Sequence, residues 1–351
     1  MTEEVHDCCK HGDHEKKKPW FQSFLFLTAA VSALLMGAAV LFEPFHPLKH
    51  VFNEYFGMMF WPIMLGFVIG GIIEYYIPQE YISRHLASHE TKTVFYATGL
   101  GFLMSTCSHG ILALSMALHR KGASGPAVVS FLLSSPWANF PITILLVGFF
   151  GWRGILIILS ALVVAVTTGM ILQALDRKGW IEKNRHYVKT DLSFSIRKDI
   201  QVRWKNYRFS FKQTAEDLTG VCKGMISLAN MVLPWILVGI ILASLSSVFV
   251  PHATFHRFFG PSFTGLLMTI FLATVLEVCS EGTSPLAFEI YKQTGAFGNA
   301  FAFLMGGVVT DYTEIGMLWK NVGPKTALWT LAVSLPQIFF IAILFNRWLS
   351  A

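Results

Sequence analysis

Long runs of apolar residues, separated by short polar stretches, dominate the chain. Residues 24–42 contain no charged side chain, and the uncharged runs 154–175 and 225–250 are longer still. A helix needs about 20 apolar residues to cross the hydrocarbon core of a bilayer. The pattern therefore predicts an all-α integral membrane protein that is polytopic, crossing the bilayer several times.

The apolar segments form a lone first segment followed by two sets of four. They lie at residues 22–43, 51–77, 94–118, 127–150, 154–175, 220–250, 263–291, 296–318 and 327–345. The two sets align at nearly one offset, because Cys107 matches Cys279 (279 − 107 = 172). Asn139 matches Asp311 at the same offset (311 − 139 = 172). Internal repeats are common in transporters, so two related membrane halves are expected.

This alignment divides the chain into five parts. We expect a cytoplasmic His/Cys tail at 1–20, an extra transmembrane helix at 21–50, a first repeat at 51–175, a basic cytoplasmic loop at 176–218 and a second repeat at 219–351. The tail does not have the pattern of a signal peptide, since no small-residue cleavage site follows the first apolar run.

The distribution of Lys and Arg predicts how the segments cross. If segments 94–118 and 263–291 are re-entrant hairpins, each repeat has three full spans and the two halves are inverted. The N-terminus and the connections around residues 78–92, 119–125, 176–218 and 319–326 then share one side and hold most of the basic residues outside the spans. Basic loops mark the cytoplasmic side.

Both repeats carry interruptions at corresponding places. The hairpins have Gly110 and Gly282 near their middles. The next segments are interrupted by residues 134–141 in the first repeat and by residues 306–314, which include two glycines and a carboxylate, in the second. Paired interruptions of this kind are the best sequence indication of a binding site at the membrane midplane.

Charge is sparse and concentrated. Charged residues make up 14% of the chain, and the net charge is +6. The stretch 176–218 holds eleven Lys and Arg against six Asp and Glu, close to the whole excess. This stretch joins two membrane halves and has no nucleic-acid-binding motif, so a nucleic-acid partner is not expected. The chain is expected in the inner (cytoplasmic) membrane, with the lipid bilayer as its surroundings.

Polar residues at the predicted interruptions are the candidates for solute binding. They are Cys107, Ser108, His109, Ser135, Asn139, Cys279, Ser280, Glu281, Ser284, Thr310 and Asp311. Placing an acidic group inside the membrane costs free energy unless the group is paired or in contact with water. We therefore assign coupling-ion handling to Glu277, Glu281, Asp311 and Glu314. Protons are the first choice, with Na⁺ left open, and Glu289 is expected near the interface beside Lys292.

The cysteines indicate a soft solute. Thiolates at the equivalent positions Cys107 and Cys279 would suit trivalent arsenic, Cu(I) or Zn²⁺. Free cysteine also packs as a small apolar residue, and that alternative stays open. The N-terminal tail has a metal-binding composition without the spacing of a folded zinc site. Its candidate ligands are Cys8, Cys9, His11 and His14.

At these motifs the chain resembles the predicted-permease family that includes the ArsP-type exporters of trivalent organoarsenicals, another branch of which is associated with copper and zinc efflux. The resemblance rests on CSHGILALSMALHRKGASGPAVVSFLLSSPWAN and EVCSEGTSPLAFEIYKQTGAFGNAFAFLMGGVVTDYTEIGMLW and spans most of residues 50–345. It implies secondary efflux without ATP. The chain departs from the family pattern at His109, where a second cysteine is usual, and at Ala113, where proline is usual.

These observations predict a secondary permease that exports a small thiophilic solute, either a trivalent organoarsenical or a soft metal ion, in exchange for protons. The first alternative is a channel or an uptake carrier for a small anion or another small solute. A membrane enzyme is the least favoured, since no zincin-type pairing of histidines is present. No cofactor is expected. A homo-oligomer stays open.

Overall fold

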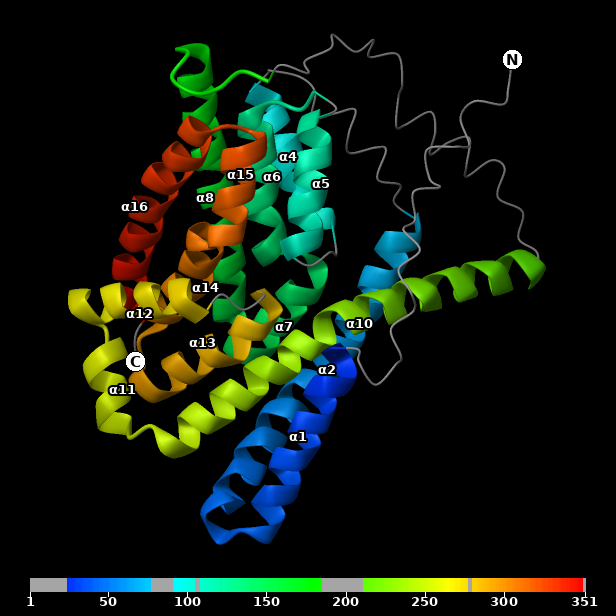
Figure 1. Ribbon diagram of the computed structural model, residues 1–351, viewed down its shortest axis with the longest axis vertical. Coiled ribbons are helices and arrows are strands. Elements are labelled where there is room, and N and C mark those ends of the chain that lie inside the picture. The colour runs from blue at the N-terminus through cyan, green and yellow to red at the C-terminus, as the bar shows by residue number, and fades with distance from the viewer. Residues whose placement is uncertain are drawn as a thin grey trace.

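The computed structural model describes residues 24–76, 91–104, 108–120, 122–184, 211–276 and 280–349. Throughout these residues the regular structure is helical, without a strand, which confirms an all-α polytopic membrane protein. Figure 1 shows most of the helices gathered into one bundle, with α1, the lower part of α2 and the first part of α10 extending beyond it.

The helices of the first half are mostly those expected from the apolar segments. They are α1 (Phe24–Leu41), η2 (Glu43–Phe45), α2 (His46–Tyr76), α4 (Thr91–Leu103), α5 (Ser108–Arg120), α6 (Gly125–Ala138), α7 (Phe140–Phe150) and α8 (Trp152–Arg177). The second half continues with α10 (Phe211–Phe249), α11 (His252–Phe259), α12 (Phe263–Leu276), α13 (Ser280–Thr294), α14 (Phe297–Thr310), α15 (Tyr312–Asn321) and α16 (Pro324–Trp348).

Four of the described helices, α2, α8, α10 and α16, are long and apolar enough to cross a bilayer. The pairs α6–α7 and α11–α12 also pass this test as units, bent by 45° and 97°. The described part of the chain therefore holds four such spans, or up to six if each bent pair is one span.

Helix boundaries recur at the offset found in the sequence. The helix after each expected hairpin tip begins at Ser108 in one half and at Ser280 in the other (280 − 108 = 172). The two parts of the next segment begin at Gly125 and Phe140, and their counterparts begin 172 residues later (297 − 125 = 172; 312 − 140 = 172). The division into two repeats stays a prediction, and this recurrence supports it.

One end of the bundle collects the start of α4 and the end of α5. Arg177, at the end of α8, donates a hydrogen bond from Nη2 to Oγ1 of Thr91 at 3.1 Å. Asn184 donates from Nδ2 to the carbonyl oxygens of His119 at 2.6 Å and Ala123 at 2.7 Å. The chain therefore enters α4 and leaves α5 at this end, which we call the Arg177 end, as a re-entrant pair would.

The opposite end, which we call the Arg153 end, collects the corresponding parts of the second half. Arg153, at the start of α8, donates to the hydroxyl of Tyr291 near the end of α13. Asn299 donates from Nδ2 to the carbonyl oxygen of Gly260, just before α12, at 3.0 Å. The 26 residues of α8 separate the two ends by about 39 Å at 1.5 Å per residue. The α4–α5 and α12–α13 pairs therefore approach from opposite ends, as inverted halves require.

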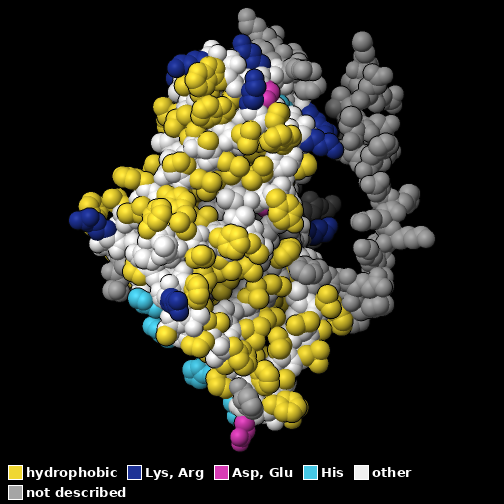
Figure 2. Space-filling model, turned by 60° about the vertical axis from the view of Figure 1, so that its left-hand side comes forward, with side chains coloured by type: hydrophobic (Ala, Val, Ile, Leu, Met, Phe, Trp, Pro, Cys, Tyr) yellow, Lys and Arg dark blue, Asp and Glu magenta, His cyan; other side chains and the backbone are white. Residues whose placement is uncertain are grey.

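Large apolar side chains cover the outside of the bundle. Examples are Trp61, Phe271, Val275 and Phe340, which are between 63% and 76% exposed. Figure 2 shows hydrophobic side chains over the middle of one face, with several Lys and Arg side chains at its upper end. Contiguous apolar surface of this kind is stable against lipid and unfavourable in water, which agrees with a multi-pass membrane protein.

One helix boundary and one additional helix differ from the sequence expectation. α10 begins at Phe211, within the stretch expected to be loop up to residue 218. The short helix α11, which the apolar pattern did not indicate, buries Phe255 while its His256 and Arg257 are exposed. A short amphipathic helix is too polar for a hydrophobicity-based prediction, and it suits the membrane interface.

Candidate functional site

Four short helices begin in the interior of the bundle and end at its two ends. α5 contacts α15, and their final turns meet at the Arg177 end, where Arg120 donates from Nη2 to Oδ1 of Asn321 at 3.2 Å. α13 contacts α7. Their final turns meet at the Arg153 end, where the rings of Phe150 and Tyr291 lie with centroids 5.8 Å apart. Each half thus packs the second helix of its hairpin against the broken helix of the other half.

Helix length places the other ends of these four helices near mid-depth. They contain 10 to 15 residues and so rise about 15–22 Å, roughly half to three-quarters of a bilayer core of about 30 Å. All four present their N-termini to the interior. Backbone N–H groups at such ends lack partners within the helix and can bind ligands.

Asn139 forms the first of two equivalent breaks. It ends α6 and caps α7, with Oδ1 accepting from the backbone N–H of Ile142 at 2.8 Å. Its Nδ2 donates to the carbonyl oxygen of Ser135 at 3.2 Å, and the side chain is 2% exposed. Asn139 therefore holds the 45° bend between the two helices.

Asp311 performs the same task in the second half. Its Oδ1 accepts from the backbone N–H groups of Thr313 at 2.7 Å and Glu314 at 3.2 Å. It also accepts from the hydroxyl of Thr313 at 2.7 Å. Its other carboxylate oxygen makes no hydrogen bond with the described residues and Asp311 is only half-buried. The charge of Asp311 therefore stays available to a ligand.

Thr310 connects this break to the second hairpin. Its hydroxyl lies 2.7 Å from the hydroxyl of Thr274, near the end of α12, and also donates to the carbonyl oxygen of Gly306 at 2.8 Å. The structure thus brings the Asp311 break next to the point where α12 ends. This is the part of the expected binding site that the described residues show assembled.

Ser135 has a packing role in the first half. Its hydroxyl donates to the carbonyl oxygen of Phe131 at 2.8 Å, and the side chain is fully buried. A Cβ atom on Gly101 of α4 would lie 2.1 Å from Oγ of Ser134 and 2.9 Å from Oγ of Ser135. The serines therefore line a close helix crossing, and the hydroxyl of Ser135 is already engaged within its own helix.

The remaining candidates fall into three groups. Ser284 and Glu314 are buried, near the starts of α13 and α15. Ser108, His109, Ser280 and Glu281 are the first residues of α5 and α13, and their side chains lie outside the described part. Seven candidates lie outside the described residues altogether: Cys8, Cys9, His11, His14, Cys107, Glu277 and Cys279.

The glycines expected to interrupt helices lie inside them instead. α14 continues through Gly306 and Gly307 to Thr310, and the break comes at Asp311. Gly110 and Gly282 lie in the first turns of α5 and α13 rather than between the hairpin helices. The reason is packing, since small residues let membrane helices approach closely.

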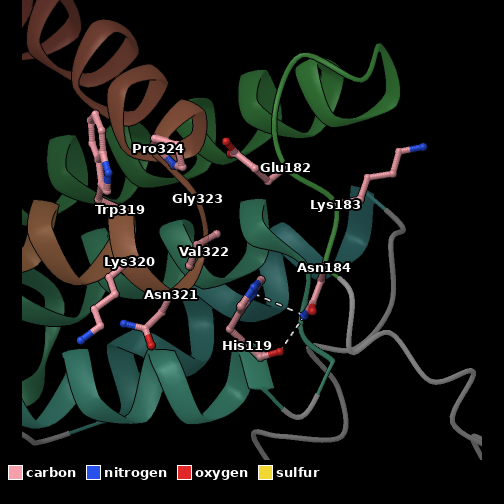
Figure 3. A pocket seen from close by; sticks show the side chains of 10 residues that line it. All are labelled: His119, Glu182, Lys183, Asn184, Trp319, Lys320, Asn321, Val322, Gly323 and Pro324. Atoms are coloured by element: carbon pink, nitrogen blue, oxygen red, sulfur yellow. Dashed lines mark hydrogen bonds between the residues drawn. The ribbon is translucent and has the colours of Figure 1, made fainter.

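A pocket of about 490 Å³ opens at the Arg177 end, between the final turns of α5 and α15 (Figure 3). Its lining includes His119, Glu182, Asn184, Trp319 and Lys320. It lies at the opposite ends of α5 and α15 from the breaks, so it is not the expected binding site. No sequence motif indicates this pocket, because its walls come from separate connections.

Glu182, on one wall of this pocket, caps α16 from a distant part of the chain. Its carboxylate accepts from the backbone N–H groups of Lys325 and Thr326, each at 3.0 Å, and from the hydroxyl of Thr326 at 3.0 Å. Burial alone would raise the pKa of Glu182, but these hydrogen bonds to the ionised form outweigh it and lower the pKa. The segment after α8 is thereby fixed to the start of α16.

Among the described acids Glu289 is the most deeply buried, and sequence reasoning did not assign it to the site. Its expected place near the interface beside Lys292 stays a prediction; the sequence did not indicate that it is fully buried and accepts a hydrogen bond from Tyr55. The two residues are 234 positions apart, so no local spacing links them. Within the described residues, His, Cys, Asp and Glu side chains do not gather in groups of three that could hold a metal ion.

Comparisons with known proteins agree with this architecture. The family described as "Predicted permease" (ArsP_1) matches residues 45–346. A Streptococcus mutans protein, named for a subunit of a two-component membrane permease complex, is 22% identical over 74% of this chain and 81% of its own length. The UPF0718 protein YcgR of Bacillus subtilis is 23% identical over 73% and 82%. No solved structure was found to match. The chain therefore belongs to the ArsP_1 family of predicted permeases and is a multi-pass membrane permease.

Proposed function

We propose that this permease is a secondary transporter that exports a small thiophilic solute, a trivalent organoarsenical or a soft metal ion, in exchange for protons. The observation that carries the proposal is the arrangement of four short helices in two contacting pairs, α5 with α15 and α7 with α13, each pair formed between the two halves. Their lengths lead us to place their N-termini near mid-depth. Inverted halves with broken helices and a midplane site are the arrangement through which transporters expose one site to each side in turn.

The cysteines supply the preference for a soft solute. Cys107 directly precedes the first residue of α5, and Cys279 directly precedes the first residue of α13. Thiolates are stabilised at helix N-termini, and thiolates select soft metals and metalloids. Asp311 and Thr310 at the neighbouring break would complete the binding site on the side of the second half.

The test is solute-dependent proton flux in everted membrane vesicles. The solutes are methylarsenite, phenylarsenite, arsenite, Zn²⁺ and Cu(I). We expect Cys107→Ser and Cys279→Ser to abolish flux of the transported solute. Cys222→Ser is the matched control, because Cys222 is an exposed free cysteine in α10. If both tip variants transport like wild type, the thiophilic assignment is wrong.

One observation favours a second candidate, a carrier for a small anion. Helix N-termini carry partial positive charge and bind anions, and four of them begin at mid-depth. The acidic group of Asp311 at one of these ends weighs against it. Phosphate and arsenate in the same vesicle panel separate the two functions, since an anion carrier would move them and would not need the cysteines.

The name of the streptococcal relative raises the question of a partner subunit. We propose that the permease works without a nucleotide-hydrolysing partner, since the halves together contain the whole candidate site. Purified protein in proteoliposomes should then transport with a pH gradient alone. Transport that appears only after another membrane fraction and ATP are added would contradict this.

A further inference from the structure

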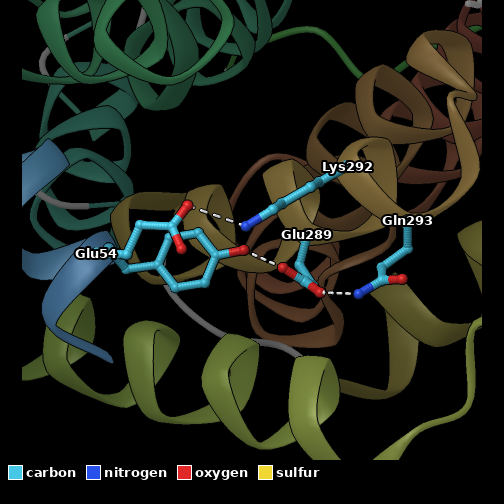
Figure 4. A network of polar contacts seen from close by, with 5 residues as sticks. Glu54, Glu289, Lys292 and Gln293 are labelled. Atoms are coloured by element: carbon cyan, nitrogen blue, oxygen red, sulfur yellow. Dashed lines mark hydrogen bonds and ion pairs between the residues drawn. The ribbon is translucent and has the colours of Figure 1, made fainter. Parts of the chain in front are cut away.

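Glu289 is a fully buried carboxylate in α13 whose two oxygens each accept a hydrogen bond from a neutral side chain. Oε2 accepts from the hydroxyl of Tyr55 in α2, and Oε1 accepts from Nε2 of Gln293 at 2.6 Å. Tyr55 is fully buried as well. Figure 4 shows Glu289 facing Gln293, with Lys292 and Glu54 beside them.

No cation pairs with this carboxylate among the described residues. Lys292, one turn along α13, pairs with Glu54 instead, at 3.0 Å, and both of these side chains are 39% exposed. Burying an ionised carboxylate without a cationic partner costs several kcal/mol. An acidic group in a membrane segment that carries this cost is more often functional than structural.

The helices packed around Glu289 offer few other titratable groups. α7, α14 and residues 234–249 of α10 contain none. Arg153 of α8 is bonded to Tyr291, and α11 adds the exposed side chains of His252, His256 and Arg257. The first turns of α2, the helix that carries Tyr55, add the exposed side chains of His46, Lys49 and His50. Lys292 places Nζ 5.6 Å from the centre of the Tyr55 ring while it pairs with Glu54. Of all the titratable groups described, Tyr55 is therefore the one that bonds directly to Glu289.

Aromatic rings fix Tyr55 in place. Its ring lies edge-on to Phe149 and Phe288, with centroids 6.4 Å and 6.2 Å away. Phe150 packs edge-on against Phe288 from the other side, at 5.5 Å. This packing holds the tyrosine hydroxyl against the carboxylate of Glu289. The aromatic rings make this side of the pair apolar, so we expect a proton to be carried here by a side chain.

Glu289 lies between the Arg153 end and the candidate site. Along α13 it comes three residues before Lys292 and eight residues after Glu281, or about 4.5 Å and 12 Å along the helix axis. The exposed pair Lys292–Glu54 thus lies on one side of it, and the start of α13 lies on the other.

We propose that Glu289 carries the coupling proton between the Arg153 end and the binding site, with Tyr55 as its positioning residue. This inference rests on the proposed proton-coupled function. In each cycle the carboxylate binds one proton from the Arg153 end and releases it toward the Arg177 end, while the solute moves the other way. Both forms find partners, because the ionised form accepts from Tyr55 and Gln293, and the protonated form can donate to the tyrosine oxygen.

The first test uses purified protein in proteoliposomes with methylarsenite as the probe. We expect Glu289→Gln to reduce transport driven by a pH gradient by roughly a hundredfold, the scale of a lost proton-transfer group. Exchange of labelled for unlabelled methylarsenite, which needs no net proton movement, should continue. Tyr55→Phe should keep exchange and shift the pH dependence of transport toward higher pH. Glu43→Gln, an exposed acid beside α2, is the matched control.

Two outcomes of this test overturn the inference. If Glu289→Gln keeps gradient-driven transport, the carboxylate carries no coupling proton. If it loses both transport and exchange, Glu289 is needed for the folded site rather than for protons.

The second test needs no solute and separates failure of the inference from failure of the proposed function. Infrared difference spectra between two pH values should show the C=O band of a protonated carboxyl group in wild type that is missing in Glu289→Gln. If wild type transports none of the probes but shows this band, the proposed function fails and the titrating carboxyl group stands. If the band is unchanged in the variant, the inference fails.

Discussion

Asn139 and Asp311 cap equivalent half-helices, but Asp311 alone brings a charge to its break. The amide oxygen of Asn139 shows that a neutral side chain can accept the capping hydrogen bond. We therefore expect Asp311→Asn to unfold at the same temperature as wild type and to lose transport. Asp311→Ala should lose transport and also about 1 kcal/mol of stability, the usual value of a cap. If Asp311→Asn transports like wild type, the charge of Asp311 is not needed and the residue acts only as a helix cap.

Glu182 gives a prediction about pH. Because its pKa is lowered in the folded protein, its stabilising effect is present above the pKa of the unfolded chain and is lost as the pH falls through the folded value. The test compares thermal unfolding of wild type and Glu182→Gln in detergent. At neutral pH we expect the free energy of unfolding of wild type to be higher by about 0.3–1 kcal/mol. The difference should shrink toward zero in acid. A difference that is constant with pH would exclude the ionised cap as its cause.

For single residues, the sequence could predict a role where the repeat marks the position, and could not predict a contact between residues far apart in the chain. The match of Asn139 with Asp311 was visible because each lies at the same place in its repeat. The bond between Tyr55 and Glu289 joins α2 to α13 and leaves no periodic trace in either helix. The candidate cysteines at the tips, Cys107 and Cys279, stay predictions.

At the scale of helices, glycine in this protein serves close packing more than interruption. A Cβ atom on Gly239 of α10 would lie 2.0 Å from the carbonyl oxygen of Gly282, in the first turn of α13. A backbone oxygen cannot move as a flexible side chain can, so α10 and the start of α13 would have to separate. The sequence pattern located the breaks to within a few residues, but it could not distinguish a glycine that ends a helix from one that lets a neighbour approach.

This crossing gives a prediction with a matched control. We expect Gly239→Ala to lower stability by about 1–3 kcal/mol, as overpacking does, and to impair transport, because it displaces the helix that begins beside Cys279. Gly99→Ala in α4 should have little effect on either, since nothing lies within 4 Å of the added methyl group. Thermal unfolding and vesicle flux measure both. Equal behaviour of the two variants would mean that the crossing tolerates adjustment.

At the scale of the whole molecule, the hydrogen bonds at the two ends of α8 explain why the charge pattern was informative. The connections expected to share one side, around residues 91, 119–125 and 319–326, do meet at the Arg177 end. The sequence could predict this because the positive-inside rule acts on every short loop at once. It could not predict the pocket or the cap by Glu182 at that end, since these arise from the way separate connections pack together.

The orientation itself is the remaining prediction. We expect the Arg177 end to face the cytoplasm, because it is the more basic one. In a background with Cys8, Cys9 and Cys222 replaced by Ser, Lys320→Cys and Arg257→Cys place exposed thiols at the Arg177 and Arg153 ends. A membrane-impermeant maleimide added to intact cells should label Arg257→Cys, and should label Lys320→Cys only after the membrane is opened. The reverse pattern would place the Glu289 proton pathway on the cytoplasmic side, and proton entry there could no longer drive export.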